Sequence, residues 1–258
     1  MSEKRVLSKK TSICLLAGAT TLLLTLLLFL NPIPQSQQYH LFADTKSWLG
    51  IPNASNVLSN LPFAFIGIWG LIVLFFPHKK LFLDNRERWP WITFSIGLFL
   101  TALGSAYYHL SPDNARLVWD RLPMTLVFMS LATALICERI STPFGLLAWP
   151  ILIAIGFSSI VYWHHTNDLR PYLGVQLFTL LVMLLMLVTV SPYNRNWDLA
   201  VIIILFALAR LFEFFDKEIY RLTANVASGH TLKHLAAALA ALWLIRMISK
   251  RKIVTDEH

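Results

Sequence analysis

Apolar stretches of about 20 residues are the feature that most constrains this chain, because one such helix crosses the roughly 30 Å hydrocarbon layer of a bilayer. Eight of them follow one another along the 258 residues, at 12–30, 56–76, 90–110, 118–137, 144–163, 172–190, 197–216 and 230–248. They are continuous rather than alternating, which argues against membrane-spanning β-strands. The sequence therefore predicts an all-α integral membrane protein with eight transmembrane helices.

The composition points the same way. Apolar residues make up 56% of the chain, and Asp, Glu, Lys and Arg together only 14%, whereas an ordinary soluble domain carries about 25% charged residues. This deficit argues against a soluble enzyme, a disordered chain and a disulfide-stapled secreted module. The two cysteines, Cys14 and Cys137, lie within apolar stretches, and we interpret them as free packing residues.

The apolar pattern divides the chain into five regions. We expect a basic tail at 1–11, an anchor helix at 12–30, an extracytoplasmic loop at 31–55, a seven-helix core at 56–248 and a second tail at 249–258. The stretch at 12–30 is long for a signal peptide, and no small-residue cleavage motif follows it. We therefore predict that this segment is an additional, uncleaved transmembrane helix.

The distribution of Lys and Arg predicts the orientation. If the N-terminus is cytoplasmic, 14 of the 22 Lys and Arg residues fall on the cytoplasmic side, five fall outside, and Arg121, Arg210 and Lys233 lie within spans. An excess of positive charge marks cytoplasmic loops. We predict cytoplasmic termini, and cations that orient the chain rather than bind nucleic acid. The compact loops and short tails favour a bacterial inner membrane.

Five polar residues fall at the expected outer ends of three spans: Ser105, His109, Asp120, His230 and His234. Ser105 and His109 are four residues apart and share one helix face, as do His230 and His234. Ionisable groups at membrane depth are costly and usually mark function. We expect the five residues to form one site.

Three histidines from two helices suit a zinc ion, because catalytic zinc sites use three protein ligands and leave a position for water. We predict His109, His230 and His234 as the ligands. Asp120, placed at the start of its helix where the helix dipole favours a negative charge, would accept a proton from the water. Ser105 would donate a hydrogen bond to a developing oxyanion. Together these groups describe metal-assisted hydrolysis of a carbonyl compound.

Structural readings of the same residues remain open. His109 alone can be a hydrogen bond between helices, Asp120 can be an N-cap, and Ser105 can simply permit close helix packing. We expect His164 and His165 in a solvated outer loop, as reserve ligands.

Two further polar features have structural interpretations. The spacing of Arg210 and Glu213 permits an ion pair on one helix face. His40 lies in a loop with no visible partner.

The arrangement of the site residues resembles the alkaline ceramidases, which belong to a membrane hydrolase superfamily that also contains adiponectin and progestin-type receptors. The motifs are Ser105-x-x-x-His109, Asp120 eleven residues further on, and His230-x-x-x-His234 in the last span. The resemblance covers about residues 44–248.

Two shorter features add to this resemblance. The run Asn56–Asn60 resembles the start of the family's first core helix. Asp216 resembles an acidic position that the family keeps before its last span.

The resemblance implies a fold and a reaction. It implies that zinc binds to the three histidines, that Asp120 activates water and that Ser105 supports the oxyanion. The substrate would be ceramide or a related N-acyl lipid from the bilayer, cleaved at its amide to a long-chain amine and a fatty acid.

The family's calcium site falls in a stretch where this chain offers only Asp44 as a carboxylate, with Asn53 and Asn56 as neutral ligands. Calcium prefers six to eight oxygens, so we expect no tight calcium site.

Three other functions remain open from the sequence. The protein could be a zinc-containing lipid receptor or transporter without hydrolysis, or a lipid esterase. A haem or quinone electron carrier is a third alternative, although two ligands four residues apart suit a small ion better than a flat ring. Nothing in the sequence indicates the oligomeric state.

Overall fold

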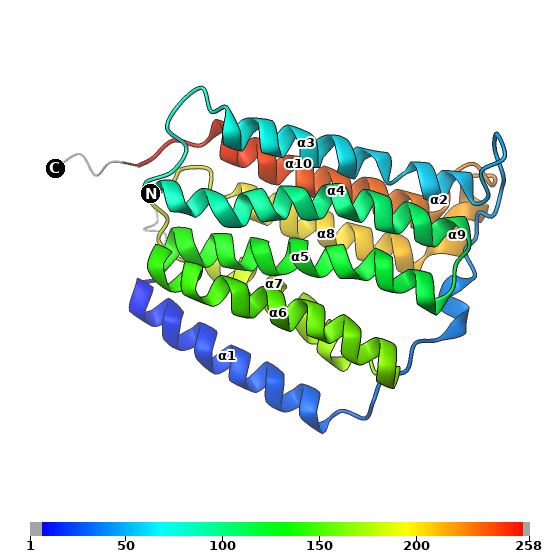
Figure 1. The fold of residues 1–258 in the computed structure, drawn as a ribbon, viewed down its shortest axis with the longest axis horizontal. Helices are drawn as coiled ribbons and strands as arrows, with labels where there is room; N and C mark the ends of the chain where they lie inside the picture. Colours follow the sequence, from blue (N-terminus) through cyan, green and yellow to red (C-terminus); the bar gives the residue numbers. More distant parts are fainter. Residues whose placement is uncertain (1–6, 255–258) are drawn as a thin grey trace.

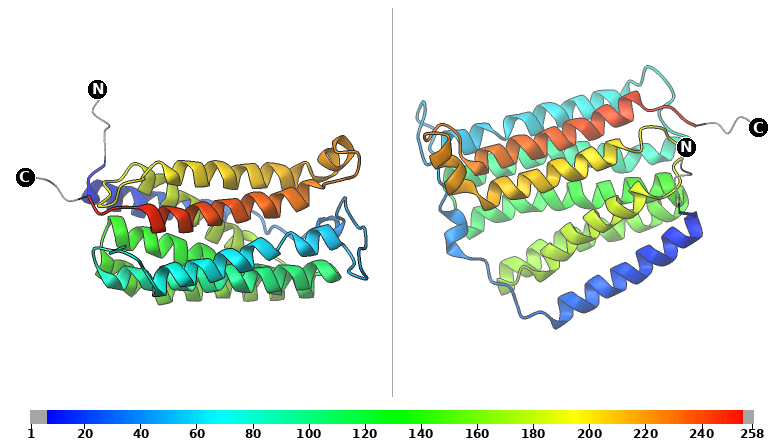
Figure 2. Two further views of the ribbon diagram at one scale, coloured as in Figure 1. Left: turned by 90° about the horizontal axis from the view of Figure 1, so that it is seen from above. Right: turned by 180° about the vertical axis from the view of Figure 1, so that it is seen from behind.

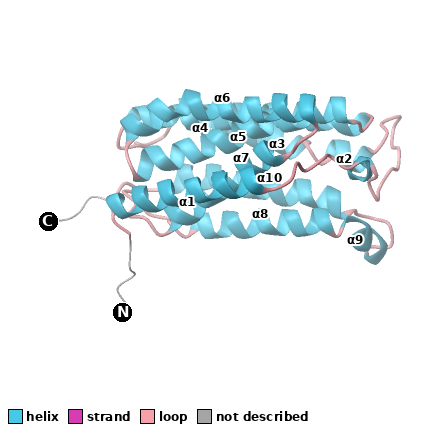
Figure 3. Cartoon of the chain, turned by 90° about the horizontal axis from the view of Figure 1, so that it is seen from below, coloured by secondary structure: helices cyan, strands magenta, loops and turns pink. Residues whose placement is uncertain are grey.

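The computed structural model describes residues 7–254, which fold into helices joined by short loops (Figure 3). The long helices are α1 (Lys9–Phe29), α3 (Leu61–Phe75), α4 (Arg88–Leu110), α5 (Asn114–Arg139), α6 (Thr142–Thr166), α7 (Arg170–Leu187), α8 (Asp198–Phe214) and α10 (Gly229–Lys250). The short ones are α2 (Ala54–Leu58) and α9 (Asp216–Leu222), with 3-10 turns at Gln37–His40 and Asn85–Glu87.

The expected all-α membrane fold is confirmed. Among the described residues, seven helical segments are long and apolar enough to cross a membrane, and α1 is one of them. The stretch expected at 197–216 forms α8, whose 17 residues rise about 25 Å. This helix runs alongside the others through the bundle (Figure 1).

The helices form two layers (Figure 2). Consecutive contacts join α3, α4, α5 and α6 in one layer, and α1, α7, α8 and α10 make up the other. Helix α5 is largely buried, whereas α1 is largely exposed and lies at the edge beside α7 (Figure 1). The core therefore lies between the layers, and α1 is an addition to it.

Both ends of the described chain lie at one end of the bundle. Leu7 pairs with Thr189, and Ile253 with Tyr193, so both reach the connection between α7 and α8. At the same end Arg251, 2% exposed, donates to Glu138 at 2.7 Å. This buried ion pair ties the segment after α10 to α5, and removing either partner would leave an uncompensated buried charge.

Two helix boundaries differ from the sequence expectation. The first core helix, expected at 56–76, is broken into α2 and α3 around Ser59 and Asn60, because Pro62 sits in the first turn of α3 and helices favour proline there. The helix expected at 118–137 begins at Asn114, where the Asp113 side chain accepts a hydrogen bond from the Arg116 amide.

The earlier start of α5 corrects the interpretation of Asp120. This residue lies almost two turns inside the helix rather than at its start. Asp120 is therefore not an N-cap, and the charge at the helix N-terminus, which falls off within the first turn, does not act on it as expected. Its position must be explained by what it contacts across the helix interface.

The crossing of α4 and α5 depends on Gly104. A methyl group at this position would lie 1.9 Å from the Trp119 carbonyl oxygen, so the two helices could not keep their separation. We expect Gly104→Ala to destabilise the protein by about 1–3 kcal/mol, the usual cost of overpacking. Gly18→Ala, on exposed α1 with no atom near the new methyl, is the control and should have the wild-type melting temperature or a slightly higher one. Thermal unfolding in detergent compares them; equal melting temperatures would contradict the close approach.

Candidate metal centre

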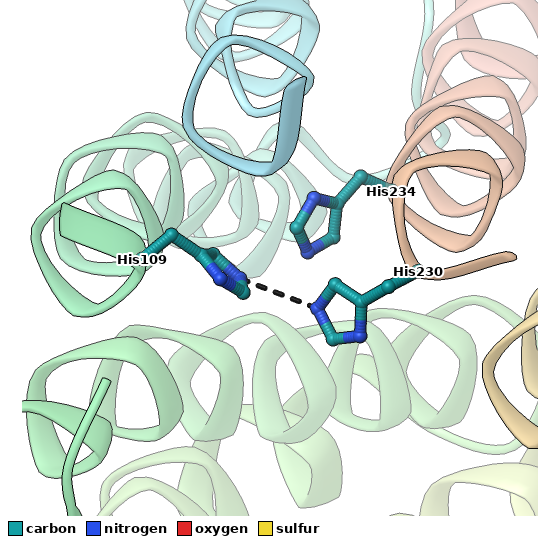
Figure 4. A group of neighbouring side chains, drawn as sticks. All are labelled: His109, His230 and His234. Atoms are coloured by element: carbon teal, nitrogen blue, oxygen red, sulfur yellow. Dashed lines mark hydrogen bonds between the residues drawn. The ribbon is translucent and has the colours of Figure 1, made fainter. Parts of the chain in front are cut away.

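Three histidines meet between the two layers (Figure 4). His109 comes from the last turn of α4, and His230 and His234 come from the first two turns of α10. One nitrogen from each ring lies within 4.8 Å of the others, and the Nε2 atoms of His109 and His230 are 3.3 Å apart. All three residues are at most 4% exposed. Within the described residues, this is the group of side chains that can hold a metal ion.

The hydrogen bond of His234 shows which of its nitrogens is free. The Ser59 hydroxyl lies 2.7 Å from His234 Nδ1 and donates to the Asn56 carbonyl oxygen. Because the hydroxyl has one hydrogen, His234 Nδ1 must carry a proton, and Nε2 keeps a lone pair. This is the outer hydrogen bond that metal-binding histidines usually make.

The other two rings also fit a small divalent cation. Their Nε2 atoms face each other at 3.3 Å, and two ligands held at about 2.0–2.1 Å in a tetrahedral zinc site are about 3.4 Å apart. His109 Nδ1 is buried without a hydrogen-bond partner, and the main-chain amide of His230 donates to Asp216 Oδ1 at 2.7 Å. Asp216 therefore fixes the start of α10. The three imidazole nitrogens and their spacing suit a zinc ion.

Asp120 contacts Ser105, which lies one helical turn before His109 on α4. The Ser105 hydroxyl donates a hydrogen bond to the Asp120 carboxylate. They are 2% and 7% exposed, respectively, and come from α4 and α5. The structure therefore brings Asp120 of α5 against Ser105, which lies one turn before His109 on α4, while the group of potential metal ligands consists of the three histidines.

A segment before α2 covers the histidines on the side that faces the end of the bundle. We call residues 35–44 the strap. Its Phe42 ring lies 4.3 Å from the His230 ring and 4.8 Å from the His109 ring, measured between centroids. The strap was missed from the sequence, because a loop has no periodicity to reveal what it covers.

A buried ion pair lies next to the site. Lys233, one residue before His234, donates to Glu213 Oε1 at 2.7 Å, and the Tyr39 hydroxyl donates to the same oxygen at 3.1 Å. Burial and the Glu213 charge raise the pKa of Tyr39, so its hydroxyl keeps its proton. The predicted Arg210–Glu213 pair is also present. Sequence reasoning had set Lys233 aside, although its place inside the His-x-x-x-His motif was a signal.

The remaining candidates lie elsewhere. His164 and His165 are exposed in the last turn of α6, rather than in a loop, and are not part of the cluster. The expectation that His40 has no partner is wrong: its ring forms hydrogen bonds with the Tyr108 hydroxyl at 2.8 Å and the Asn114 amide oxygen at 2.9 Å. Both cysteines are free.

The three residues weighed as calcium ligands are engaged in hydrogen bonds. Asp44 is 1% exposed and accepts from the Lys46 amide through Oδ1. Asn53 donates to the His109 carbonyl oxygen, and the Asn56 amide oxygen accepts from Thr231. The last two contacts join Asn53, just before α2, to α4 and Asn56 of α2 to α10, the two helices that carry the histidines.

An apolar cavity begins one helical turn below the site. Its lining includes Thr101, one turn before Ser105; Met124, one turn after Asp120; and Ala237, one turn after His234. The cavity lies between the two layers, and carbon side chains dominate its wall. The Thr101 hydroxyl donates to the Gly97 carbonyl within α4, so it presents no free donor to the interior.

A comparison with protein families decides the affiliation of this chain. Residues 50–249 match the ceramidase family model. The chain belongs to the ceramidase family. The match covers the helices that hold the histidines, Ser105 and Asp120, and ends with α10; α1 lies outside it. No curated protein matches the chain.

Ser59 should raise the affinity for the metal through its hydrogen bond to His234, without being a ligand itself. Replacing the outer hydrogen-bond partner of a ligating histidine weakens metal binding about 10- to 100-fold. We therefore expect Ser59→Ala to lose zinc to a competing chelator at a correspondingly lower chelator concentration. Ser55→Ala, one turn earlier on α2, is the matched control and should keep the wild-type affinity. Equal zinc affinities in the two variants would contradict the role of Ser59.

Proposed function

We propose that the protein is a zinc-dependent hydrolase that cleaves the amide bond of ceramide or a related N-acyl lipid, releasing a long-chain amine and a fatty acid. The main support for this proposal is that three buried imidazoles converge one helical turn from the wall of an apolar cavity. Membership of the ceramidase family supports an amide hydrolase.

His109, His230 and His234 would hold the zinc ion. When bound, zinc supplies a Lewis acid for the amide carbonyl and lowers the pKa of a bound water to about 7. Because the lone pairs of the three ligand nitrogens would be taken up by the metal, another group has to receive the proton from water.

Asp120 would be this proton acceptor. In the structure its carboxylate accepts a hydrogen bond from Ser105, which orients it. Once Asp120 takes a proton, its O–H can donate to Ser105 Oγ, and the Ser105 hydrogen is released for the oxyanion that develops on the substrate. Asp120 then returns its proton to the leaving amine. The Ser105–Asp120 contact thereby couples proton uptake to stabilisation of the oxyanion.

The acyl chain would occupy the cavity between the layers. An acyl chain that moves from the bilayer into the cavity would exchange lipid neighbours for apolar side chains. Its amide would then lie at the level of the histidines. A substrate dissolved in the bilayer would enter laterally. We also propose, from the distribution of Lys and Arg, that both termini are cytoplasmic and that the site faces the outer side of a bacterial inner membrane.

The role of Asp120 can be separated from metal binding. We expect Asp120→Asn to keep one zinc per chain, while its turnover number falls about 10²–10⁴-fold, because an amide cannot accept the proton. Metal analysis and fatty-acid release from ceramide, other lipid amides and the corresponding esters measure the two quantities. Asp113→Asn, which changes the carboxylate at the N-cap of the same helix, is the control. Full turnover by Asp120→Asn would reject the mechanism.

The cavity predicts a dependence on acyl-chain length. Ala241 lines the cavity about two turns below His234. We expect Ala241→Phe to fill the deep part and to lower the cleavage of long-chain substrates about 10-fold or more relative to short-chain ones. Leu239→Phe, at an exposed position of the same helix, should keep the wild-type preference. A folded Ala241→Phe protein with unchanged chain-length preference would place the acyl chain elsewhere.

A further inference from the structure

The outer side of the site is closed by an aromatic side chain from a loop. Phe42 is 8% exposed and lies against two of the three histidine rings. It also packs edge-on against Tyr108, with 6.0 Å between ring centroids. Its neighbour Leu41 is 64% exposed. The chain therefore turns one apolar side chain of the strap outward and inserts the next one over the histidines.

The strap is held at several points along its length. Its side chains reach three helices: Gln35 accepts from Arg121 of α5 at 2.7 Å, Tyr39 donates to Glu213 of α8, and His40 bonds Tyr108 of α4.

The strap is also anchored through its main chain. The Ala43 amide donates to Asp216 Oδ2 at 2.9 Å. Asp216 also receives the amide of His230, so one carboxylate fixes both the strap and a candidate ligand. Surface loops are ordinarily mobile, whereas hydrogen bonds to four helical segments keep this one over the site.

We propose that the strap is the outer wall of the substrate site and that Phe42 limits the size of the polar head group that fits beside the histidines. This inference rests on the proposed amide hydrolysis for the identity of the substrate. The covering of the histidines by Phe42 is independent of it. The ligand class is an N-acyl lipid with a small, uncharged head group.

The limit on size follows from the two sides of the site. The cavity takes the acyl chain on the inner side, and the polar head group on the amine part of the lipid must find room in another direction. Phe42 occupies the outward direction. A hydroxymethyl group needs little room beside the ring, but a sugar or a phosphodiester requires the ring to move.

The charges near the strap agree with an uncharged head group. Lys233 is paired with Glu213, and Arg210 lies against the same carboxylate. Arg121, which donates to Gln35, is a third cation, and Asp44 at the end of the strap, Asp216 and Asp120 are further carboxylates. Among these groups the cations do not outnumber the carboxylates, and the protein alone offers no net attraction to an anionic head group.

The covering of the histidines is tested without metal or turnover. Diethyl pyrocarbonate modifies accessible neutral imidazoles, and peptide mass mapping gives the rate at each histidine. We expect metal-free Phe42→Ala to react about tenfold faster than wild type at His109 and His230, because the local opening cost falls. The exposed His164 and His165 serve as internal references. Leu41→Ala, the matched control, should react at the wild-type rate.

The limit on head-group size is tested with zinc-loaded protein and three lipids of the same acyl chain: ceramide, monoglycosylated ceramide and sphingomyelin. We expect wild type to prefer ceramide, and Phe42→Ala to raise cleavage of the larger lipids relative to ceramide by about tenfold, within the range that pocket size discriminates. Phe42→Leu should give a smaller change and guards against misfolding of the alanine variant. Leu41→Ala should keep the wild-type ratio.

Each result has a defined meaning. Equal wild-type cleavage of all three lipids, or an unchanged ratio in folded Phe42→Ala, overturns the limit on head-group size. An unchanged modification rate overturns the covering. If wild type cleaves none of the lipid amides, the hydrolase proposal fails, while the modification rates still decide whether the strap covers the histidines.

Discussion

The convergence of imidazoles from the two layers is the constraint on which the rest of the structure depends. Burying three polar rings in an apolar bundle is costly unless their nitrogens are satisfied. The hydrogen bond with Ser59 satisfies Nδ1 of His234. Nδ1 of His109, which is not the nitrogen that faces His230, has no hydrogen-bond partner. A bound cation would interact with the three lone pairs that face one another, and this interaction would offset the cost of burying the rings.

The position of this cluster explains the division of the molecule into two parts. Toward the middle of the bundle the wall is carbon, as far as Leu244. Toward the other end it is polar and aromatic, where Tyr39 of the strap donates to Glu213 and Glu213 pairs with Lys233. A lipid amide has the same division between acyl chain and head group, and its scissile bond lies at the boundary. The two-layer fold therefore places reactive groups where the polarity of such a substrate changes.

Much of the site was predictable because helical spacing is a local property. The four-residue spacing of Ser105 and His109, and of His230 and His234, fixed shared faces without any knowledge of packing. The depth of Asp120 was mistaken, because the apolar run hides the true start of α5. The Asp113–Asn114 pair before it is a capping signal that could have located that start. The strap and the role of Ser59 depend on contacts between distant segments, and no periodicity in the sequence reports those.

The most direct measurement of the central claim is X-ray absorption spectroscopy at the zinc edge of the purified, zinc-loaded protein. The account predicts a first shell of three imidazole nitrogens at about 2.0–2.1 Å, with one oxygen from water. Sulfur in the first shell, a shell of oxygen atoms alone, or fewer than three imidazoles would contradict it. The same spectrum recorded on His230→Ala should show the loss of one imidazole or of the ion itself.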